Sequence, residues 1–150
     1  MTQADKLIEK IGGQSAVVGI VGLGYVGLPL VLGFVDRGFR VIGLDIDEGK
    51  VKALQGGESY IEHIPGESIR EAVEDGRLEP TSDFSEASRA DALIMCVPTP
   101  LDDHNEPDLS FVVGTIKGLV PHLRVGQIVS LESTTYPGTT EEELRPRIEG

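Results

Sequence analysis

A glycine-rich turn is the strongest chemical signal in the sequence. Residues 22–27 read Gly-Leu-Gly-Tyr-Val-Gly and follow Ala16–Val21, an uncharged run rich in β-branched residues that predicts a buried strand. Gly22 can make the tight turn, Gly24 lets the backbone approach a pyrophosphate, and Gly27 lets a following helix pack closely on the strand. That helix would direct unpaired N–H groups and its positive dipole end at the phosphates. The pattern predicts a dinucleotide-binding βα unit.

An acid stands where a nucleotide-binding unit needs one. Arg40–Leu44 predicts a second strand, and Asp45 ends it, eighteen residues after Gly27. A carboxylate at this position accepts hydrogen bonds from the adenosine ribose hydroxyls and repels a 2′-phosphate. We therefore expect NAD rather than NADP as the cofactor.

The uncharged stretch Ala16–Val35 has a second interpretation, because a transmembrane helix has this length. Five glycines and Pro29 dilute its hydrophobicity, and its flanks lack the Lys or Arg cluster that would fix an orientation. Together with the position of Asp45, these features favour the nucleotide-binding interpretation.

The composition limits the partners and the compartment. The chain has 150 residues, with 25 acidic against 13 basic side chains and a net charge of −12. This balance argues against nucleic acid and anionic lipid, which need basic surfaces. The N-terminus has no signal-peptide pattern, and the single cysteine, Cys96, fits a reducing compartment. We expect a cytoplasmic protein without a nucleic-acid or membrane partner.

Apolar strands alternate with helical patterns along the whole chain, which predicts one α/β domain with a Rossmann-like, doubly wound parallel sheet. The helix at 67–75 should turn Ile69 and Val73 inward, and Ser82 or Asp83 should cap the short helix that follows. Strands are predicted at 16–21, 40–44, 78–81, 92–97 and 128–132, and helices at 2–11, 27–35, 47–55, 67–75, 82–89, 109–123 and from about 140.

In such a sheet the ligand binds at the carboxyl ends of the strands. Three loops follow strands there: Gly22–Gly27, Pro98–Pro100 and Ser133–Gly138. Thr99 and Thr134 lie in two of these loops, and each hydroxyl either caps a turn or faces the cofactor.

The other reactive residue types give weaker signals. Cys96 lies in an apolar run, where a thiol has a raised pKa and low reactivity. His63, His104 and His122 are scattered without ligand spacing, so no metal site is expected. The acidic loop at 101–108 lacks the glycine and the glutamate spacing of a calcium loop.

Three segments carry a family resemblance. They are GLGYVGLP at 22–29, CVPTP at 96–100 and ESTTYPGTTE at 132–141. They resemble the three N-terminal motifs of the UDP-glucose/GDP-mannose dehydrogenase family. The third segment, with Glu-Pro-Asp at 106–108, is most similar to the branch that oxidises UDP-N-acetylhexosamines.

The resemblance implies oxidation of a sugar-nucleotide C6 alcohol to a carboxylate in two steps, with two NAD⁺. It implies that Asp45 and Lys50 lie on the ribose side of the cofactor. It places Thr99 and Thr134 near the reactive end, with Thr134 as an auxiliary catalytic residue beside the water or the substrate. The implied cofactor-binding residues are Gly22, Gly24, Tyr25, Val26, Gly27, Asp45, Lys50, Val97, Pro98, Thr99, Ser133 and Thr134.

In this family the nucleophilic cysteine and its lysine and asparagine partners lie downstream, in a substrate-binding domain, and Cys96 does not match that cysteine. The resemblance therefore implies that residues 1–150 are the NAD-binding domain of a longer, homo-oligomeric enzyme of polysaccharide biosynthesis. We expect this truncated chain, without the central and C-terminal UDP-sugar-binding domains, to be inactive alone. Two alternatives stay open: an NAD-dependent dehydrogenase of the 3-hydroxyacid type and a non-catalytic nucleotide-sensing module.

Overall fold

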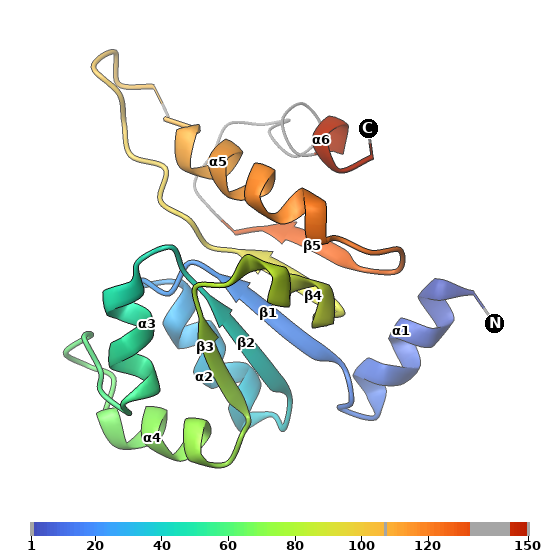
Figure 1. Cartoon of the computed structure of the whole chain (residues 1–150), viewed down its shortest axis with the longest axis vertical. Coiled ribbons are helices and arrows are strands. Elements are labelled where there is room, and N and C mark those ends of the chain that lie inside the picture. Colours follow the sequence, from blue (N-terminus) through green and yellow to red (C-terminus); the bar gives the residue numbers. More distant parts are fainter. Residues whose placement is uncertain (1, 107, 133–144, 150) are drawn as a thin grey trace.

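Five parallel strands form the centre of the fold. A computed structural model describes residues 2–106, 108–132 and 145–149. The strands are β1 (Val17–Val21), β2 (Arg40–Leu44), β3 (Leu78–Thr81), β4 (Ala92–Met95) and β5 (Ile128–Leu131). They lie in the order β3-β2-β1-β4-β5, with every neighbouring pair parallel (Figure 1). The predicted Rossmann-like, doubly wound sheet is confirmed.

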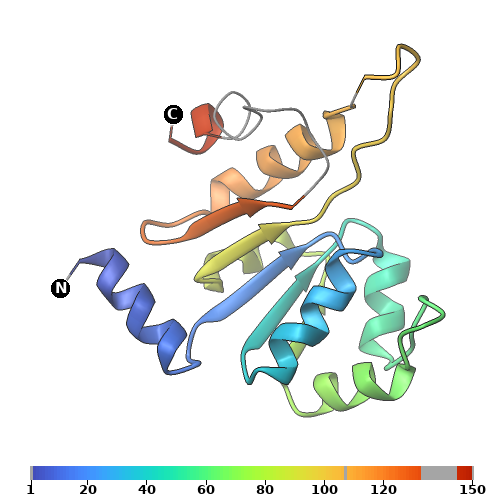
Figure 2. The same cartoon turned by 180° about the vertical axis from the view of Figure 1, so that it is seen from behind.

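Helices cover both faces of the sheet. In Figure 2, seen from behind, α2 lies across the strands that hide it in Figure 1. The helices are α1 (Gln3–Gly12), α2 (Gly27–Asp36), α3 (Glu48–Gln55), α4 (Gly66–Glu74), α5 (Ser110–Leu119) and α6 (Arg145–Glu149), with the 3₁₀ turns η1 (Phe84–Arg89) and η2 (Val120–His122).

Alternation along the strands creates two cores. Val18 and Ile20 of β1 pack into a core with α2, α3, α4 and β3, whereas Val21 packs into a second core with η1 and α5. Because successive side chains of a strand point to opposite faces, a strand covered on both sides must be apolar throughout. This requirement explains the continuous apolar run of β1.

A buried acid fastens α1 to the sheet at the amino ends of the strands. Thr2 and Asp5 form a capping box at the start of α1. Asp91, which is 4% exposed, accepts hydrogen bonds from the Val17 amide at 2.8 Å and from Lys10 and Arg124 at 3.0 Å each. This anchor holds the edge of the sheet opposite the carboxyl ends, where a ligand would bind.

Several boundaries differ from the sequence prediction. The predicted helix 109–123 is α helical only to Leu119, because Pro121 has no N–H to continue the ladder, and η2 follows. The predicted strand 92–97 ends at Met95, shortly before Pro98. In α4, Ala72 rather than Val73 is fully buried beside Ile69.

Other predictions hold in part. The short helix predicted at 82–89 is a 3₁₀ helix that begins at Phe84, and Asp83 is its cap. The predicted start of the last helix lies outside the described residues. Within the described part of the chain, no helix is long and apolar enough to cross a membrane.

Candidate functional site

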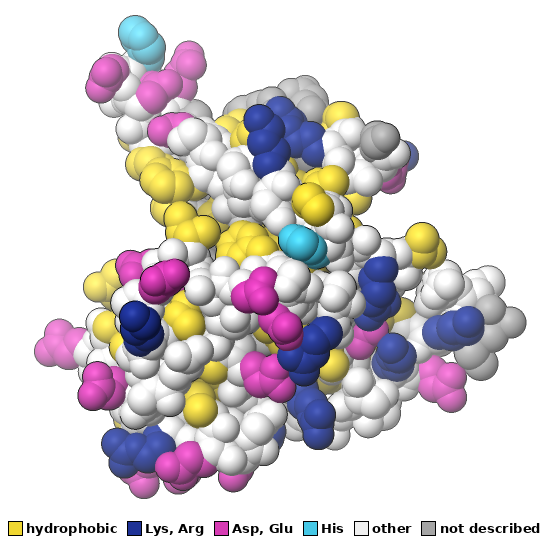
Figure 3. All heavy atoms as spheres, viewed as in Figure 1, with side chains coloured by type: hydrophobic (Ala, Val, Ile, Leu, Met, Phe, Trp, Pro, Cys, Tyr) yellow, Lys and Arg dark blue, Asp and Glu magenta, His cyan; other side chains and the backbone are white. Residues whose placement is uncertain are grey.

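A cleft opens at the carboxyl ends of β1 and β4. These strands are neighbours, with Val21 paired to Met95, and the chain leaves them toward opposite halves of the sheet. The cleft has a volume of about 830 Å³. Its lining comes from the glycine turn, the end of β2 and the loop after β4, together with Phe84, Phe111 and Thr115. Figure 3 shows apolar side chains gathered in the indentation between the body of the sheet and the α5 region.

Two glycines of the turn are sterically obligatory. Gly22 has φ +96°, and a Cβ on it would lie 2.5 Å from the Cys96 carbonyl oxygen. A Cβ on Gly27 would overlap the Gly22 carbonyl oxygen. The first glycine thus allows the strand to turn beside β4, and the third allows α2 to begin against the turn.

Gly24 serves a different purpose, because a Cβ there would meet no atom within 4 Å. Its open side faces the cleft, and Tyr25 and Val26 beside it are 78% and 55% exposed. No described residue accepts a hydrogen bond from the amides of these three residues. The first turn of α2 also contains no acidic side chain. This arrangement fits the diphosphate of a dinucleotide, which needs amide donors and close access.

Asp45 lies at the carboxyl end of β2 and lines the cleft. Its Oδ2 accepts a hydrogen bond from the Leu23 amide at 2.8 Å, and its Oδ1 accepts one from the Asp47 amide at 2.9 Å. Each oxygen keeps a further acceptor position, so the carboxylate is oriented by the backbone and can still receive ribose hydroxyls. Asp47 caps α3 through the amides of Gly49 and Lys50.

Lys50 also lines the cleft, and its Nζ lies 5.8 Å from the centroid of the Tyr60 ring. A second hollow of about 490 Å³ adjoins the first, and Gly24, Tyr25 and Lys50 line both. The predicted ribose-side lysine therefore lies beside the glycine turn.

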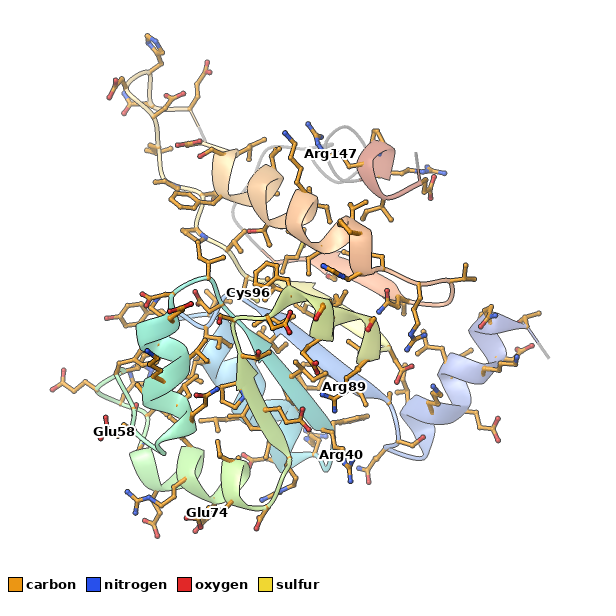
Figure 4. All side chains as sticks on the ribbon, viewed as in Figure 1. Arg40, Glu58, Glu74, Arg89, Cys96 and Arg147 are labelled. Atoms are coloured by element: carbon orange, nitrogen blue, oxygen red, sulfur yellow. The ribbon has the colours of Figure 1, made fainter. Side chains whose placement is uncertain are left out.

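The loop after β4 forms the opposite wall with Val97, Pro98 and Thr99. Cys96 begins this wall, and Figure 4 shows it where the strands end. Burial, together with the charge of Glu132, raises the pKa of the Cys96 thiol to about 11, so the thiol is neutral at physiological pH. The structure therefore gives Cys96 the environment of an unreactive thiol.

The structure brings ten of the predicted cofactor-binding residues to one site. Nine of them line the cleft, and Gly27 supports the turn from the start of α2. Ser133 and Thr134 lie outside the described residues. Among the described residues, no three His, Cys, Asp or Glu side chains form a group that could hold a metal ion.

Sequence reasoning missed Tyr60. Its hydroxyl donates a hydrogen bond to the carbonyl of Leu23, inside the glycine turn. The segment from Glu58 to Pro65 has no regular periodicity. Its apolar residues Ile61 and Ile64, which pack in the core, are the signal that could have indicated its position. The aromatic wall of Phe84 and Phe111 was missed as well.

Comparison with known proteins agrees with this geometry. The model of the UDP-glucose/GDP-mannose dehydrogenase family, NAD binding domain, matches residues 16–150. The chain is 38% identical over 132 residues to a UDP-N-acetyl-D-glucosamine 6-dehydrogenase of Pseudomonas aeruginosa, covering 88% of this chain and 30% of that protein. It is 39% identical over 126 residues to a UDP-N-acetyl-D-mannosamine dehydrogenase of Salmonella typhi, covering 83% and 29%.

Solved structures show the same relationship. A GDP-mannose dehydrogenase of Pseudomonas aeruginosa superposes with a TM-score of 0.83 at 30% identity, covering 88% of this chain and 31% of that one. An NDP-N-acetyl-D-galactosaminuronic acid dehydrogenase of Methanosarcina mazei gives 0.84 at 32% identity, covering 99% and 34%. The chain spans about 30% of the length of the curated relatives it matches. It belongs to the UDP-glucose/GDP-mannose dehydrogenase family, and residues 16–150 are the NAD binding domain.

Proposed function

We propose that this chain is the NAD-binding part of a nucleotide-sugar dehydrogenase. The proposed reaction oxidises the C6 alcohol of a UDP-N-acetylhexosamine to the aldehyde and then to the carboxylate, and each two-electron step uses one NAD⁺. The substrate class is supported by two of the relatives, which are dehydrogenases of UDP-N-acetylglucosamine and UDP-N-acetylmannosamine. The family membership sets aside the alternative of a 3-hydroxyacid-type enzyme.

The observation that carries the proposal is the convergence of the glycine turn, Asp45 and the loop after β4 on one cleft. Bound there, NAD⁺ would supply the hydride acceptor. The amides of Gly24, Tyr25 and Val26 would bind its diphosphate, and Asp45 would hold the adenosine ribose.

The reactive end of the cofactor would lie along Val97, Pro98 and Thr99, on the far side of the turn. We propose that Ser133 and Thr134 complete this region, as the resemblance of the third motif implies. The apolar side chains of the cleft, among them Phe111, would keep water away from the reacting carbon.

The second oxidation in the proposed reaction needs a reactive thiol. Burial raises the pKa of Cys96 to about 11, so this residue cannot supply a thiolate at neutral pH. A threonine hydroxyl without an activating base does not replace it. We therefore propose that residues 1–150 bind the cofactor, whereas further domains supply the sugar site and the nucleophile.

The direct test mixes the purified chain with NAD⁺ and either UDP-N-acetylglucosamine or UDP-N-acetylmannosamine, and follows NADH absorbance for hours. We expect no NADH from residues 1–150 and steady formation from the complete gene product. Turnover by residues 1–150 that Cys96→Ser abolishes would contradict the proposal. A complete product that binds NADH but oxidises neither sugar would favour a nucleotide-sensing role instead.

The cellular setting is part of the same proposal. We propose that the complete protein is a cytoplasmic homo-oligomer that supplies uronic acids for polysaccharide biosynthesis and needs no nucleic acid or membrane. The net charge of −12 and the single cysteine support it. Light scattering of the complete gene product would measure its oligomeric state, and fractionation of cells would test the compartment.

A further inference from the structure

Tyr60 reaches the glycine turn from the irregular segment between α3 and α4, which begins near Glu58 in Figure 4. Ile61 and Ile64 of this segment are buried, at 3% and 7% exposure. The Ser59 hydroxyl donates to the Ile61 carbonyl at 2.9 Å and accepts from the Ile61 amide at 3.2 Å. The buried side chains of Ile61 and Ile64 anchor the segment beside Tyr60, and the Tyr60 ring packs half-buried against the first core.

The turn is held at Leu23 from two sides. The Leu23 amide donates to Asp45 Oδ2 at 2.8 Å, and the Leu23 carbonyl accepts a hydrogen bond from the Tyr60 hydroxyl. The Leu23 side chain is fully buried in the first core. Both peptide groups that meet at Leu23 thus have fixed orientations.

The orientation of the Leu23 carbonyl determines that of the next amide. The described residues contain no cis peptide bond, and in a trans peptide the C=O and N–H groups point in opposite directions. With its carbonyl directed at Tyr60, this peptide must direct the Gly24 N–H away from Tyr60. No described residue accepts a hydrogen bond from that amide or from those of Tyr25 and Val26.

The surroundings of Tyr60 keep its hydroxyl a donor. Burial raises the pKa of Tyr60 well above its ordinary value, and the nearby carboxylates of Asp45 and Asp47 raise it further. The hydroxyl therefore stays protonated at any pH at which the protein works, and the bond to Leu23 persists.

We infer that Tyr60 is a positioning residue for the cofactor: its hydroxyl fixes the Leu23–Gly24 peptide, so that the turn presents its free amides to the diphosphate before the cofactor arrives. The inference rests on the cofactor site described above. An amide already in place does not have to be ordered during binding, and preorganisation of this kind strengthens affinity.

The test compares two ligands in Tyr60→Phe. ADP-ribose carries the diphosphate, whereas adenosine carries only the ribose and the base. We expect Tyr60→Phe to weaken ADP-ribose binding by roughly 3- to 10-fold, the value of one net hydrogen bond. Adenosine affinity should change by less than about twofold, because in the proposed site the ribose and the base would lie at Asp45 rather than on the amides of the turn. NMR titration measures both affinities.

Ser59→Ala is the matched control, because it removes hydrogen bonds from the same segment but leaves the Tyr60 hydroxyl in place. It should lower thermal stability without changing the ratio of the two affinities. The amide resonances of Gly24, Tyr25 and Val26 give a second readout. Their shifts on adding ADP-ribose should shrink in Tyr60→Phe and not in Ser59→Ala.

If Tyr60→Phe lowered the affinities for ADP-ribose and adenosine equally, or changed neither affinity, the inference would be overturned. A wild-type chain that binds neither ADP-ribose nor NADH would contradict the cofactor site itself. These results are distinguishable, because the wild-type titration comes first and does not depend on Tyr60.

Discussion

The carboxylate of Asp45 and the amide of Leu23 are joined by a hydrogen bond of 2.8 Å. The acid that follows β2 therefore shapes the glycine turn as well as facing the proposed ribose site. These two roles require different properties, since holding the amide needs only an acceptor oxygen, whereas repelling a 2′-phosphate needs the negative charge.

Two substitutions of Asp45 should separate these roles. Asp45→Asn keeps an acceptor oxygen for Leu23 and removes the charge, so it should lessen the preference for NADH over NADPH. Asp45→Ala removes both and should weaken NADH binding by about 1–3 kcal/mol. Calorimetric titration of each variant with both cofactors measures the effect, and wild-type protein that prefers NADPH would contradict the assignment.

A side chain at position 24 should leave the fold intact but prevent cofactor binding. Because its Cβ position is open, Gly24→Val should leave thermal stability close to that of the wild type while its methyl groups fill the diphosphate site. NADH fluorescence should then show no binding.

Gly33→Ala is the control. A Cβ on Gly33 would also meet no atom within 4 Å, but this residue lies in the middle of α2, away from the glycine turn. It should bind normally and gain roughly 0.4–1 kcal/mol of stability. Normal NADH binding by Gly24→Val would show that the diphosphate binds elsewhere.

Cys96 should alkylate slowly. With its pKa raised to about 11 by burial and by Glu132, the thiol is almost wholly protonated near pH 8. Iodoacetamide should react with it roughly a hundredfold more slowly than with the unfolded chain. The rate should climb as the pH approaches 11, and Glu132→Gln should shift the curve to lower pH. A fast reaction at neutral pH would show an activated thiol and reopen its catalytic role.

Asp91 should contribute to stability only while it is ionised. Burial alone would raise its pKa, but hydrogen bonds from Val17, Lys10 and Arg124 together hold the pKa below its usual value. Because the folded-state pKa is the lower one, the stabilisation is complete above the unfolded pKa of about 4 and is lost as the pH falls through the folded value.

Asp91→Asn should therefore destabilise the protein by about 2–3 kcal/mol at pH 7. The difference from wild type should shrink in strongly acidic solution. Urea unfolding across pH measures this. Glu149→Gln, which breaks an exposed ion pair with Arg145, should change stability by at most about 1 kcal/mol. A difference between Asp91→Asn and wild type that grows as the pH falls would contradict the assigned direction.

Local patterns were enough to predict much of the site. Gly22, with its positive φ, and Asp45, at the end of an apolar run, follow rules that act within a few residues. Both were predicted from residue type and spacing, and the structure places both at the cleft. The same holds for β1 and β2, whose apolar runs match their burial on both faces of the sheet.

Contacts between distant segments were beyond such rules. Tyr60 meets Leu23 across 37 residues of sequence, and its position depends on how Ile61 and Ile64 pack against the first core. No periodicity in its segment signals this contact. The end of α5 at Leu119 was missed for a simpler reason. The apolar residues around Pro121 continue the helical pattern, so the pattern did not indicate that Pro121 ends the helix.

The close approach of Gly22 to the Cys96 carbonyl has a consequence for redesign. Because a Cβ on Gly22 would lie only 2.5 Å from that oxygen, the floor of the cleft at Gly22 is main chain, and it offers no side chain to exchange. Changes of ligand preference, whether natural or engineered, must therefore come from side chains around this point, such as Asp45 and the exposed residues of the rim. There Ile46 and Leu101 are 73% and 65% exposed, and varying them leaves the turn untouched. A mutant library aimed at these two positions should retain folded protein far more often than one aimed at the floor.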